Sequence, residues 1–251
     1  MILAALLLAS ACTAAVPPEA RSVVLVGWDG ADRKHVERLL RDGRLPHLAR
    51  LAAEGSFAPL RVTTGSTQTK PGWAEILTGY AAERLGVLTN REYCPIPRGW
   101  TIFERLKLRF DPANVATAFL SGKRENIGIR GPHEICINAL SRDPVTHQST
   151  RYLRKELFNG LTQGGAPPVW VKREGEPFHL SAQAMDVRVD SLGGAAQVVR
   201  AAERTLQAWD GGRFFAFVHF DEPDKNGHKL GEASREFDEG IVAADLWLGR
   251  L

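Results

Sequence analysis

A hydroxyl two residues before a proline marks the stretch Thr-Lys-Pro-Gly-Trp-Ala-Glu-Ile-Leu-Thr-Gly at residues 69–79. Proline suits the first position of a helix, so we expect Thr69 to lie just outside a helix that starts at Pro71. Unpaired N–H groups and the positive end of the helix dipole face that position, and they bind anions, phosphate above all. Thr69 is therefore a candidate nucleophile for an anionic ester. The alternative is that Thr69 only stands near the cap of an ordinary helix.

A carboxylate follows the first apolar run of the chain. Residues 23–28, Val-Val-Leu-Val-Gly-Trp, predict a buried parallel strand, and Asp29 comes directly after them. Ligands of open α/β sheets bind at the carboxyl ends of the strands, which makes Asp29 a candidate ligand. The alternative is a turn or cap residue, although Asp32 is better placed to cap the helix that follows.

The motif Asp-x-x-x-His follows the strongest apolar run, residues 214–220. We expect Pro223 and Gly227 to fix a tight loop in which Asp224 and His228 converge. Carboxylate and imidazole together suit Zn²⁺ or a similar dication. The alternative is a solvated acidic loop that carries a surface histidine.

The elements that must position these residues alternate along the chain. Such alternation predicts βαβ units, and hence an α/β fold with a mostly parallel sheet between layers of helices. Residues 124–183 have no clear pattern apart from a short strand. We expect strands at 23–28, 57–62, 115–120, 169–171 and 214–220, and helices at 33–40, 45–54, 71–78, 101–110, 194–209 and 233–251.

The composition is that of a soluble globular protein. The chain has 251 residues, 44% of them hydrophobic, and its 32 basic and 29 acidic residues leave a net charge of +3. That balance argues against a partner such as nucleic acid or an anionic membrane. With no linker after Pro18, we predict two segments: a signal with a short linker at 1–18, and one α/β domain at 19–251.

The first 15 residues are apolar and then small, which is typical of a secretory signal. The sequence Ala-Ser-Ala-Cys at 9–12 also resembles a lipoprotein cleavage box, so Cys12 is a candidate lipid anchor. We therefore expect an exported protein, periplasmic or anchored to a membrane; a buried N-terminal helix is the alternative. Export would permit a disulfide between Cys94 and Cys136, with two ordinary thiols as the other interpretation.

Four motifs occur in an order that resembles the alkaline phosphatase superfamily, and most closely its type I phosphodiesterase/nucleotide pyrophosphatase branch. They span residues 23 to about 231, nearly the whole chain after the signal. They are Trp-Asp-Gly at 28–30, Thr-x-Pro with Leu-Thr-Gly at 69–79, Gly-Val-x-x-Asn at 86–90, and Glu-Pro-Asp-x-x-Gly-His at 222–228.

The resemblance implies a role for each matching residue. Asp29 and Thr69 would bind one of two divalent ions, expected to be zinc, and Asp224 and His228 would bind the other. Asn90 would hold a phosphoryl oxygen, as a donor of an oxyanion hole does. The function expected is metal-dependent hydrolysis of phosphate monoesters or diesters by a threonine nucleophile. Threonine at position 69 argues against a sulfatase, which needs Cys or Ser there.

Two lysines near these motifs are candidates for contact with a charged substrate. They are Lys70 and Lys123; ordinary solvated lysines are the alternative.

The sequence departs from the family pattern near its end. The Asp-His-Gly stretch and the later lone histidine that supply further metal ligands do not appear by Leu251. We therefore expect an incomplete sheet with an apolar edge beside strand 214–220, and only two protein ligands for each metal. Such a chain would be a poor enzyme unless His179 or His219 replaces a missing ligand. The alternative function is a non-catalytic or truncated family member that binds anions or partners.

Overall fold

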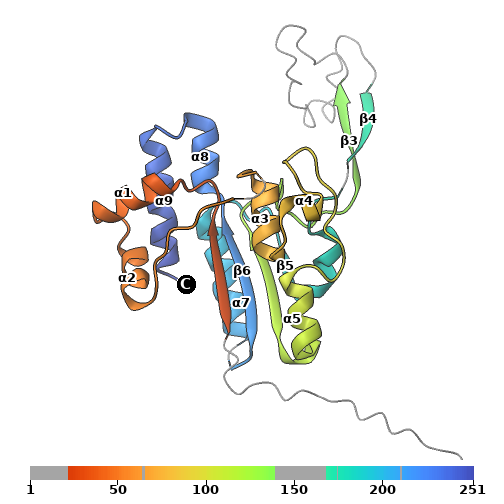
Figure 1. The fold of residues 1–251 in the computed structure, drawn as a ribbon, viewed down its shortest axis with the longest axis horizontal. Coiled ribbons are helices and arrows are strands. Elements are labelled where there is room, and N and C mark those ends of the chain that lie inside the picture. The colour runs from red at the N-terminus through yellow and green to blue at the C-terminus, as the bar shows by residue number, and fades with distance from the viewer. Residues whose placement is uncertain (1–21, 64–65, 139–167, 174, 210) are drawn as a thin grey trace, which may run out of the picture.

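The fold was analysed in a computed structural model that describes residues 22–63, 66–138, 168–173, 175–209 and 211–251 (Figure 1). Its centre is a parallel sheet of four strands in the order β1-β6-β2-β5. The strands are β1 (Val23–Trp28), β6 (Phe214–Phe220), β2 (Ala116–Ser121) and β5 (Val187–Val189).

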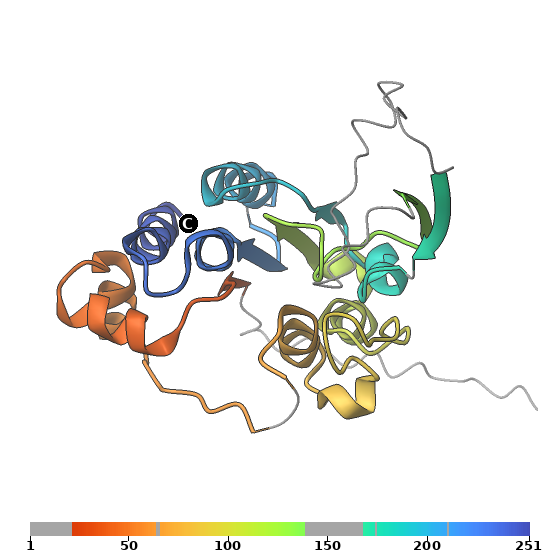
Figure 2. The same ribbon diagram turned by 90° about the horizontal axis from the view of Figure 1, so that it is seen from above.

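Helices cover both faces of this sheet, as Figure 2 shows from above. On one face lie α3 (Thr69–Thr78) and α5 (Ile102–Phe110), and on the other lie α7 (Ala195–Ala208) and α9 (Arg235–Leu248). The α/β fold with a parallel sheet between helices is therefore confirmed.

Strand β6 shows how the sequence builds both cores, because its side chains alternate between the two faces. Phe215 and Phe217 pack with side chains of α3 and α5. Ala216 and Val218 pack in a second cluster with α7. His219 follows Phe217 on the α3 face and is fully buried. A polar ring thus stands at the carboxyl end of an otherwise apolar row.

The helices α1 (Arg33–Arg41) and α2 (Pro46–Glu54) pack against α9 beyond β1. Asp32 caps α1, as expected, by accepting hydrogen bonds from the backbone N–H groups of Lys34 and His35. Glycine at 55 ends α2. The predicted helices at 33–40, 45–54, 101–110, 194–209 and 233–251 are thus confirmed to within a few residues.

The remaining elements are short. They are the helix α4 (Ala82–Leu85), the 3₁₀ helices η1 (Pro112–Asn114) and η3 (His179–Ala184), and an antiparallel pair of strands, β3 (His133–Asn138) and β4 (Pro168–Arg173). The predicted strand at 169–171 is confirmed as β4, and β3 is the partner that the sequence pattern did not indicate.

One prediction about strands is wrong. Residues 57–62 form no strand, because their side chains are exposed and nothing in the described structure pairs with them. The apolar edge expected beside residues 214–220 corresponds to β1, which pairs with β6 and is one of the two edge strands of the sheet, with Val23 and Val24 exposed.

Cys94 is an exposed free thiol, which favours the two-thiol alternative; the side chain of Cys136 lies outside the described structure. No helix in the described part of the chain has the length and apolar character needed to cross a membrane.

Candidate active site

Asp29 and Asp224 lie together where β1 ends and the helix α8 (Glu222–Leu230) begins. The backbone N–H of Asp224 donates to the carbonyl oxygen of Asp29 at 2.9 Å. Gly30 makes this approach feasible, because a Cβ at that position would lie 2.7 Å from the Cα of Asp224. Its φ of +71° also favours glycine.

The stretch from Glu222 to His228 is a helix and not the tight loop that we predicted. Pro223 lies in the first turn of α8, where a proline costs no hydrogen bond. Asp224 and His228 are then four residues apart and share one face of the helix. His228 Nε2 lies 3.4 Å from Asp224 Oδ1, and 83% of the His228 side chain is exposed.

The ammonium of Lys123 joins the two carboxylates. It pairs with Asp29 Oδ2, and it donates to Asp224 Oδ2 at 2.7 Å. Burial by itself would raise the pKa of Asp29. The contacts of Asp29 with His219 and with the charge of Lys123 outweigh that effect and lower the pKa to about 2. The same two aspartates raise the pKa of Lys123 against the effect of its burial.

The buried ring of His219 lies next to Asp29. Its Nε2 lies 3.5 Å from Asp29 Oδ2, and its Nδ1 lies 3.2 Å from the hydroxyl oxygen of Ser121. The Ser121 hydroxyl donates its one hydrogen to the carbonyl of Lys123, so it accepts from Nδ1 of the histidine. The Nε2 atom of His219 is therefore the ring atom that faces the carboxylate.

The helix α3 begins at Thr69, with Gln68 as its cap, so Thr69 is the first helical residue and Pro71 the third. This corrects the predicted start at Pro71 by two residues. Trp73 lies one turn beyond Thr69 on the same face, and its Nε1–H donates to Asp29 Oδ1 at 3.3 Å. Residue 27 must be glycine for Trp73 to lie there, because a Cβ would come within 2.1 Å of the ring.

Asn90 is held by both neighbours of Thr69. Its backbone N–H donates to Gln68 Oε1 at 2.8 Å, and its side-chain Oδ1 accepts from the backbone N–H of Lys70 at 2.8 Å. Its carbonyl oxygen accepts from Lys70 Nζ at 2.9 Å. With Oδ1 already used, the Nδ2 amide is the donor that Asn90 can offer to another group beside Thr69.

The ammonium of Lys70 is buried among protein groups. Besides Asn90, it contacts Asn126 Oδ1 at 3.0 Å, Glu176 Oε2 at 3.6 Å and the ring face of Tyr93 at 3.9 Å. Burial lowers the pKa of Lys70 and raises the pKa of Glu176, and the pairing of the two charges partly offsets both effects. Lys70 thus ties the loop at Asn126 and the segment at Glu176 to the start of α3.

The predicted residues therefore form two groups. One group consists of Asp29, Asp224, His228 and Lys123, and the other consists of Thr69, Lys70 and Asn90. Trp73 joins them, since it hydrogen-bonds Asp29 and lies one turn after Thr69. In the described structure no hydrogen bond joins Thr69 itself to Asp29.

The sequence matches the type I phosphodiesterase / nucleotide pyrophosphatase family over residues 23–251. The chain belongs to this family. Members are phosphoric ester hydrolases of the alkaline phosphatase superfamily and are typically metal-dependent. No curated protein matches the sequence.

The chain is similar to a number of solved structures, of which two are described here. One is phosphonoacetate hydrolase from Sinorhizobium meliloti 1021 in complex with phosphonoacetate, at 16% identity and a TM-score of 0.48, covering 92% of this chain and 53% of that one. The other is Ps i-CgsB in complex with k-i-k-neocarrahexaose, at 13% identity and a TM-score of 0.46. The match covers 93% of this chain and 54% of that one. The chain thus spans about half the length of these structures.

The described residues of this family member do not complete a two-metal centre. They contain no group of three or more His, Cys, Asp or Glu side chains that could hold a metal ion. The pair Asp29 and Thr69 would give one metal ion two ligands, and the pair Asp224 and His228 would give the other ion two. A catalytic zinc usually has about three protein ligands. The Lys123 ammonium also lies between the two carboxylates. We therefore derive no step through a metal.

Several residues of the site had no role in the sequence analysis. Trp73 is one of them, although its helical spacing from Thr69 could have indicated it. His219 was considered only as a replacement for a missing metal ligand. No sequence pattern indicated Gln68, Asn126 or Glu176. His179, the other histidine considered as a ligand, lies in η3, where its Nδ1 is 2.8 Å from the carbonyl of Glu176.

Proposed function

We propose that this chain hydrolyses phosphate esters, with Thr69 as the nucleophile and the Asn90 amide as the donor to a phosphoryl oxygen. One observation carries the proposal: Asn90 is fixed to the residues on either side of Thr69 through its N–H, its carbonyl and its side-chain oxygen. Such fixed placement is what an oxyanion donor requires. The start of α3 adds the backbone N–H of Thr69 and the positive end of the helix dipole for the same anion, since the N–H groups of Lys70 and Gly72 already donate to Asn90 and Gln68.

The proposed reaction has two displacements. The Thr69 oxygen forms a bond to phosphorus while the bond from phosphorus to the ester oxygen breaks, and the leaving oxygen ends with the hydroxyl proton. Water then attacks phosphorus, the bond to Thr69 breaks, and the threonine hydroxyl is restored. The sum is one ester and one water converted to one alcohol and one phosphate. Both phosphate monoesters and phosphate diesters fit this scheme.

Lys70 supports this site through Asn90 in our proposal. Its ammonium is committed to protein groups around Asn90, so it positions the oxyanion donor. Lys123 is the cation nearest to the carboxylates, and contact between Lys123 and a substrate would require it to leave Asp29 and Asp224. The substrate contacts predicted for both lysines stay predictions.

The test is hydrolysis of bis(4-nitrophenyl) phosphate and 4-nitrophenyl phosphate by the wild type, Thr69→Ala and Asn90→Ala. Thr69→Ala should remove turnover, and Asn90→Ala should lower kcat by about 100-fold, the usual cost of losing one oxyanion donor. Thr205→Ala, which removes a hydroxyl that bonds only within α7, is the matched control. Wild-type rates in Thr69→Ala would refute the assignment. Mass spectrometry of rapidly quenched enzyme should show one added phosphoryl group on Thr69.

A second candidate function is anion binding without turnover. The ion pairs of Lys123 favour it, because the ammonium already contacts both carboxylates that the family uses for metals. Absence of turnover with every metal added, together with phosphate binding that depends on Asn90, would select this alternative.

Two further expectations belong to the proposal. We infer export from the apolar start of the chain, with Cys12 as a lipid anchor; residues 1–21 lie outside the described structure. Cell fractionation of the wild type and Cys12→Ser tests it, and a protein found in the cytoplasm would refute it. Two divalent ions, expected to be zinc, are the cofactor that the family implies. Because the residues described here give each ion only two ligands, we expect weak binding, and equilibrium dialysis measures the number of ions bound.

A further inference from the structure

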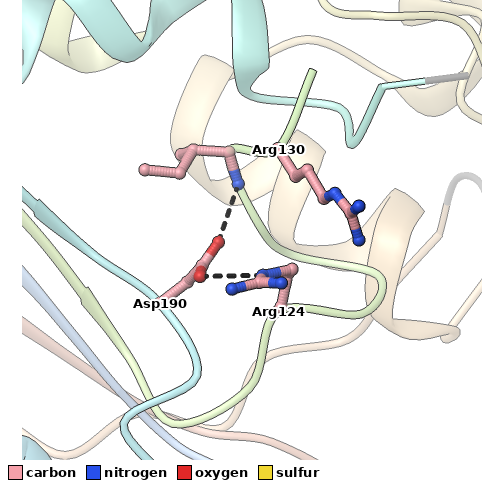
Figure 3. A pocket seen from close by; sticks show the side chains of 4 residues that line it. Arg124, Arg130 and Asp190 are labelled. Carbon is pink, nitrogen blue, oxygen red and sulfur yellow. Dashed lines mark hydrogen bonds and ion pairs between the residues drawn. The ribbon is translucent and has the colours of Figure 1, made fainter. Parts of the chain in front are cut away.

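A cavity of about 390 Å³ opens beside the loop that follows β2 (Figure 3). It is lined by Arg124, Ile129, Arg130 and Asp190. Both oxygens of Asp190 are engaged, one by Arg124 Nε at 3.1 Å and the other by the backbone N–H of Ile129 at 3.3 Å. The side chain of Arg130 makes no hydrogen bond or ion pair with the residues that the structure describes. Figure 3 shows it extending toward the stretch that carries Arg124.

The charges of this cavity do not cancel. Two guanidinium groups face one carboxylate, and Arg130 keeps its full set of N–H donors. A guanidinium offers these donors in a planar fork that matches the oxygens of a phosphate or a carboxylate. Arg124, with 45% of its side chain exposed, also keeps donors beyond the one that it gives to Asp190. The cavity therefore suits a compact oxyanion.

The cavity lies at the same edge of the sheet as the Asp29 site. Asp190 follows β5, which neighbours β2, and Lys123 and Arg124 are consecutive residues after β2. The backbone bonds from Leu192 N–H to Ser121 O (3.1 Å) and from Gly193 N–H to Gly122 O (2.8 Å) hold the two loops together. Neighbouring strands are about 5 Å apart, so an anion in the cavity beside the end of β5 would lie on the order of 10 Å from Asp224 after β6, and about one strand spacing further from Asp29 after β1.

The loop that carries both arginines is also fixed to the residue after Thr69. Asn126 accepts a hydrogen bond from Lys70 Nζ at 3.0 Å. The backbone N–H of Glu176, which pairs with Lys70, donates to the carbonyl of Arg130 at 2.7 Å. The cavity and the start of α3 therefore belong to one connected part of the molecule.

We propose that Arg130 and Arg124 form a subsite for a second anionic group, phosphate or carboxylate, of the substrate whose phosphoryl group meets Thr69. This inference rests on the proposed function and narrows its substrate class to phosphate esters with an additional anion a short distance from the reacting phosphorus. Esters without that anion are the poorer substrates.

Binding tests the subsite without any need for turnover. The probes are thymidine 3′,5′-bisphosphate and thymidine 5′-monophosphate, titrated by calorimetry into the purified full chain. The wild type should bind the bisphosphate about tenfold more tightly, as expected for one charge-assisted contact. Arg130→Met should remove that preference, and Arg124→Lys should reduce it. Arg50→Met, at an exposed arginine of α2, is the matched control and should keep it.

Turnover tests the same subsite on a matched pair of substrates, thymidine 5′-(4-nitrophenyl phosphate) with and without a 3′-phosphate. Arg130→Met should lower kcat/KM for the 3′-phosphorylated ester about tenfold and leave the other unchanged. Equal affinity of the wild type for both nucleotides, or a preference that survives in Arg130→Met, would overturn the inference. Inorganic phosphate binding that requires Arg130, without any preference between the nucleotides, would also overturn it and assign the cavity to free phosphate. If neither ester is hydrolysed but the Arg130-dependent preference remains, the proposed function fails and the subsite stands.

Discussion

Replacing Lys123 by methionine should destabilise the protein by about 2–3 kcal/mol. The change keeps the length of the side chain and leaves two carboxylates, with exposed fractions of 7% and 20%, without their shared ammonium. Removing one partner of a fully buried ion pair costs about 3–5 kcal/mol. Lys123 is 18% exposed, which lowers that cost. The fall in the pKa of Asp29 from 3.8 to about 2 corresponds to about 2 kcal/mol, which is the net effect of its partners after the opposing effect of burial.

Urea and thermal unfolding at pH 7 measure the effect. A loss of 2–3 kcal/mol corresponds to a melting temperature lower by roughly 5–10 °C in a chain of this size. Lys34→Met, at an exposed lysine of α1, should change stability little and is the control. The double variant Asp29→Asn, Lys123→Met should recover part of the loss, because it removes one of the two unpaired charges. A Lys123→Met variant as stable as the wild type would refute this account of the site.

Zinc binding gives a second readout of the same substitution. The ammonium and a dication compete for the same two carboxylates, so Lys123→Met should bind Zn²⁺ at least about tenfold more tightly than the wild type, a difference of about 1.4 kcal/mol. Competition with a chromogenic chelator measures it. Equal affinities would show that Lys123 does not occupy the position that a metal would take.

Three other substitutions test the surrounding structure. Gly27→Ala should cost about 1–3 kcal/mol in urea unfolding, because its Cβ would overlap the ring of Trp73; unchanged stability would contradict the packing. Asp238→Asn should make the melting temperature fall less as the pH is lowered from 7 to 3. Its partners Arg38 and His35 hold the pKa of Asp238 below 3.8 against its burial, so the stabilisation is full above about pH 4 and is lost as pH falls through the lowered pKa; melting temperatures from pH 7 to 3 check the sign. Lys70→Met should lower kcat for bis(4-nitrophenyl) phosphate more than it changes KM, and a change in KM alone would argue against its positioning role.

The regular core was predictable because its signals are local. Strands β1 and β6 are unbroken apolar runs, and Asp32 marks the start of α1. Strand β5 was missed because three residues, Val187–Val189, show no periodicity. The run at 57–62 has strand-like composition, but without a pairing partner its side chains remain in solvent.

The contacts of the site depend on distant pairings and could not be predicted. The resemblance placed Asp29 and Asp224 in one two-metal site, and Lys123 was a candidate for substrate contact. The ion pairs of Lys123 with both carboxylates were not foreseen, because only the order β1-β6-β2 brings the ends of these elements together. The helix α8 was mistaken for a loop because proline and glycine at 223 and 227 break most helices. In the first turn, however, proline is tolerated, and the glycine lies against the ring of Phe237 on α9.

The charge of the carboxylate pair limits how the site can receive a phosphate. Asp29 and Asp224 carry two negative charges and Lys123 one positive charge, so the cluster keeps one negative charge. Such a cluster repels a phosphate ester across a site of low dielectric. With Lys123 in this position, attraction must come from the amide of Asn90 and the first turn of α3, which precedes Trp73 in the helix. A cation with a charge of at least two, in the place of the Lys123 ammonium, would cancel this negative charge. The Lys123→Met variant leaves the two carboxylates free for such a cation, so the effect can be measured.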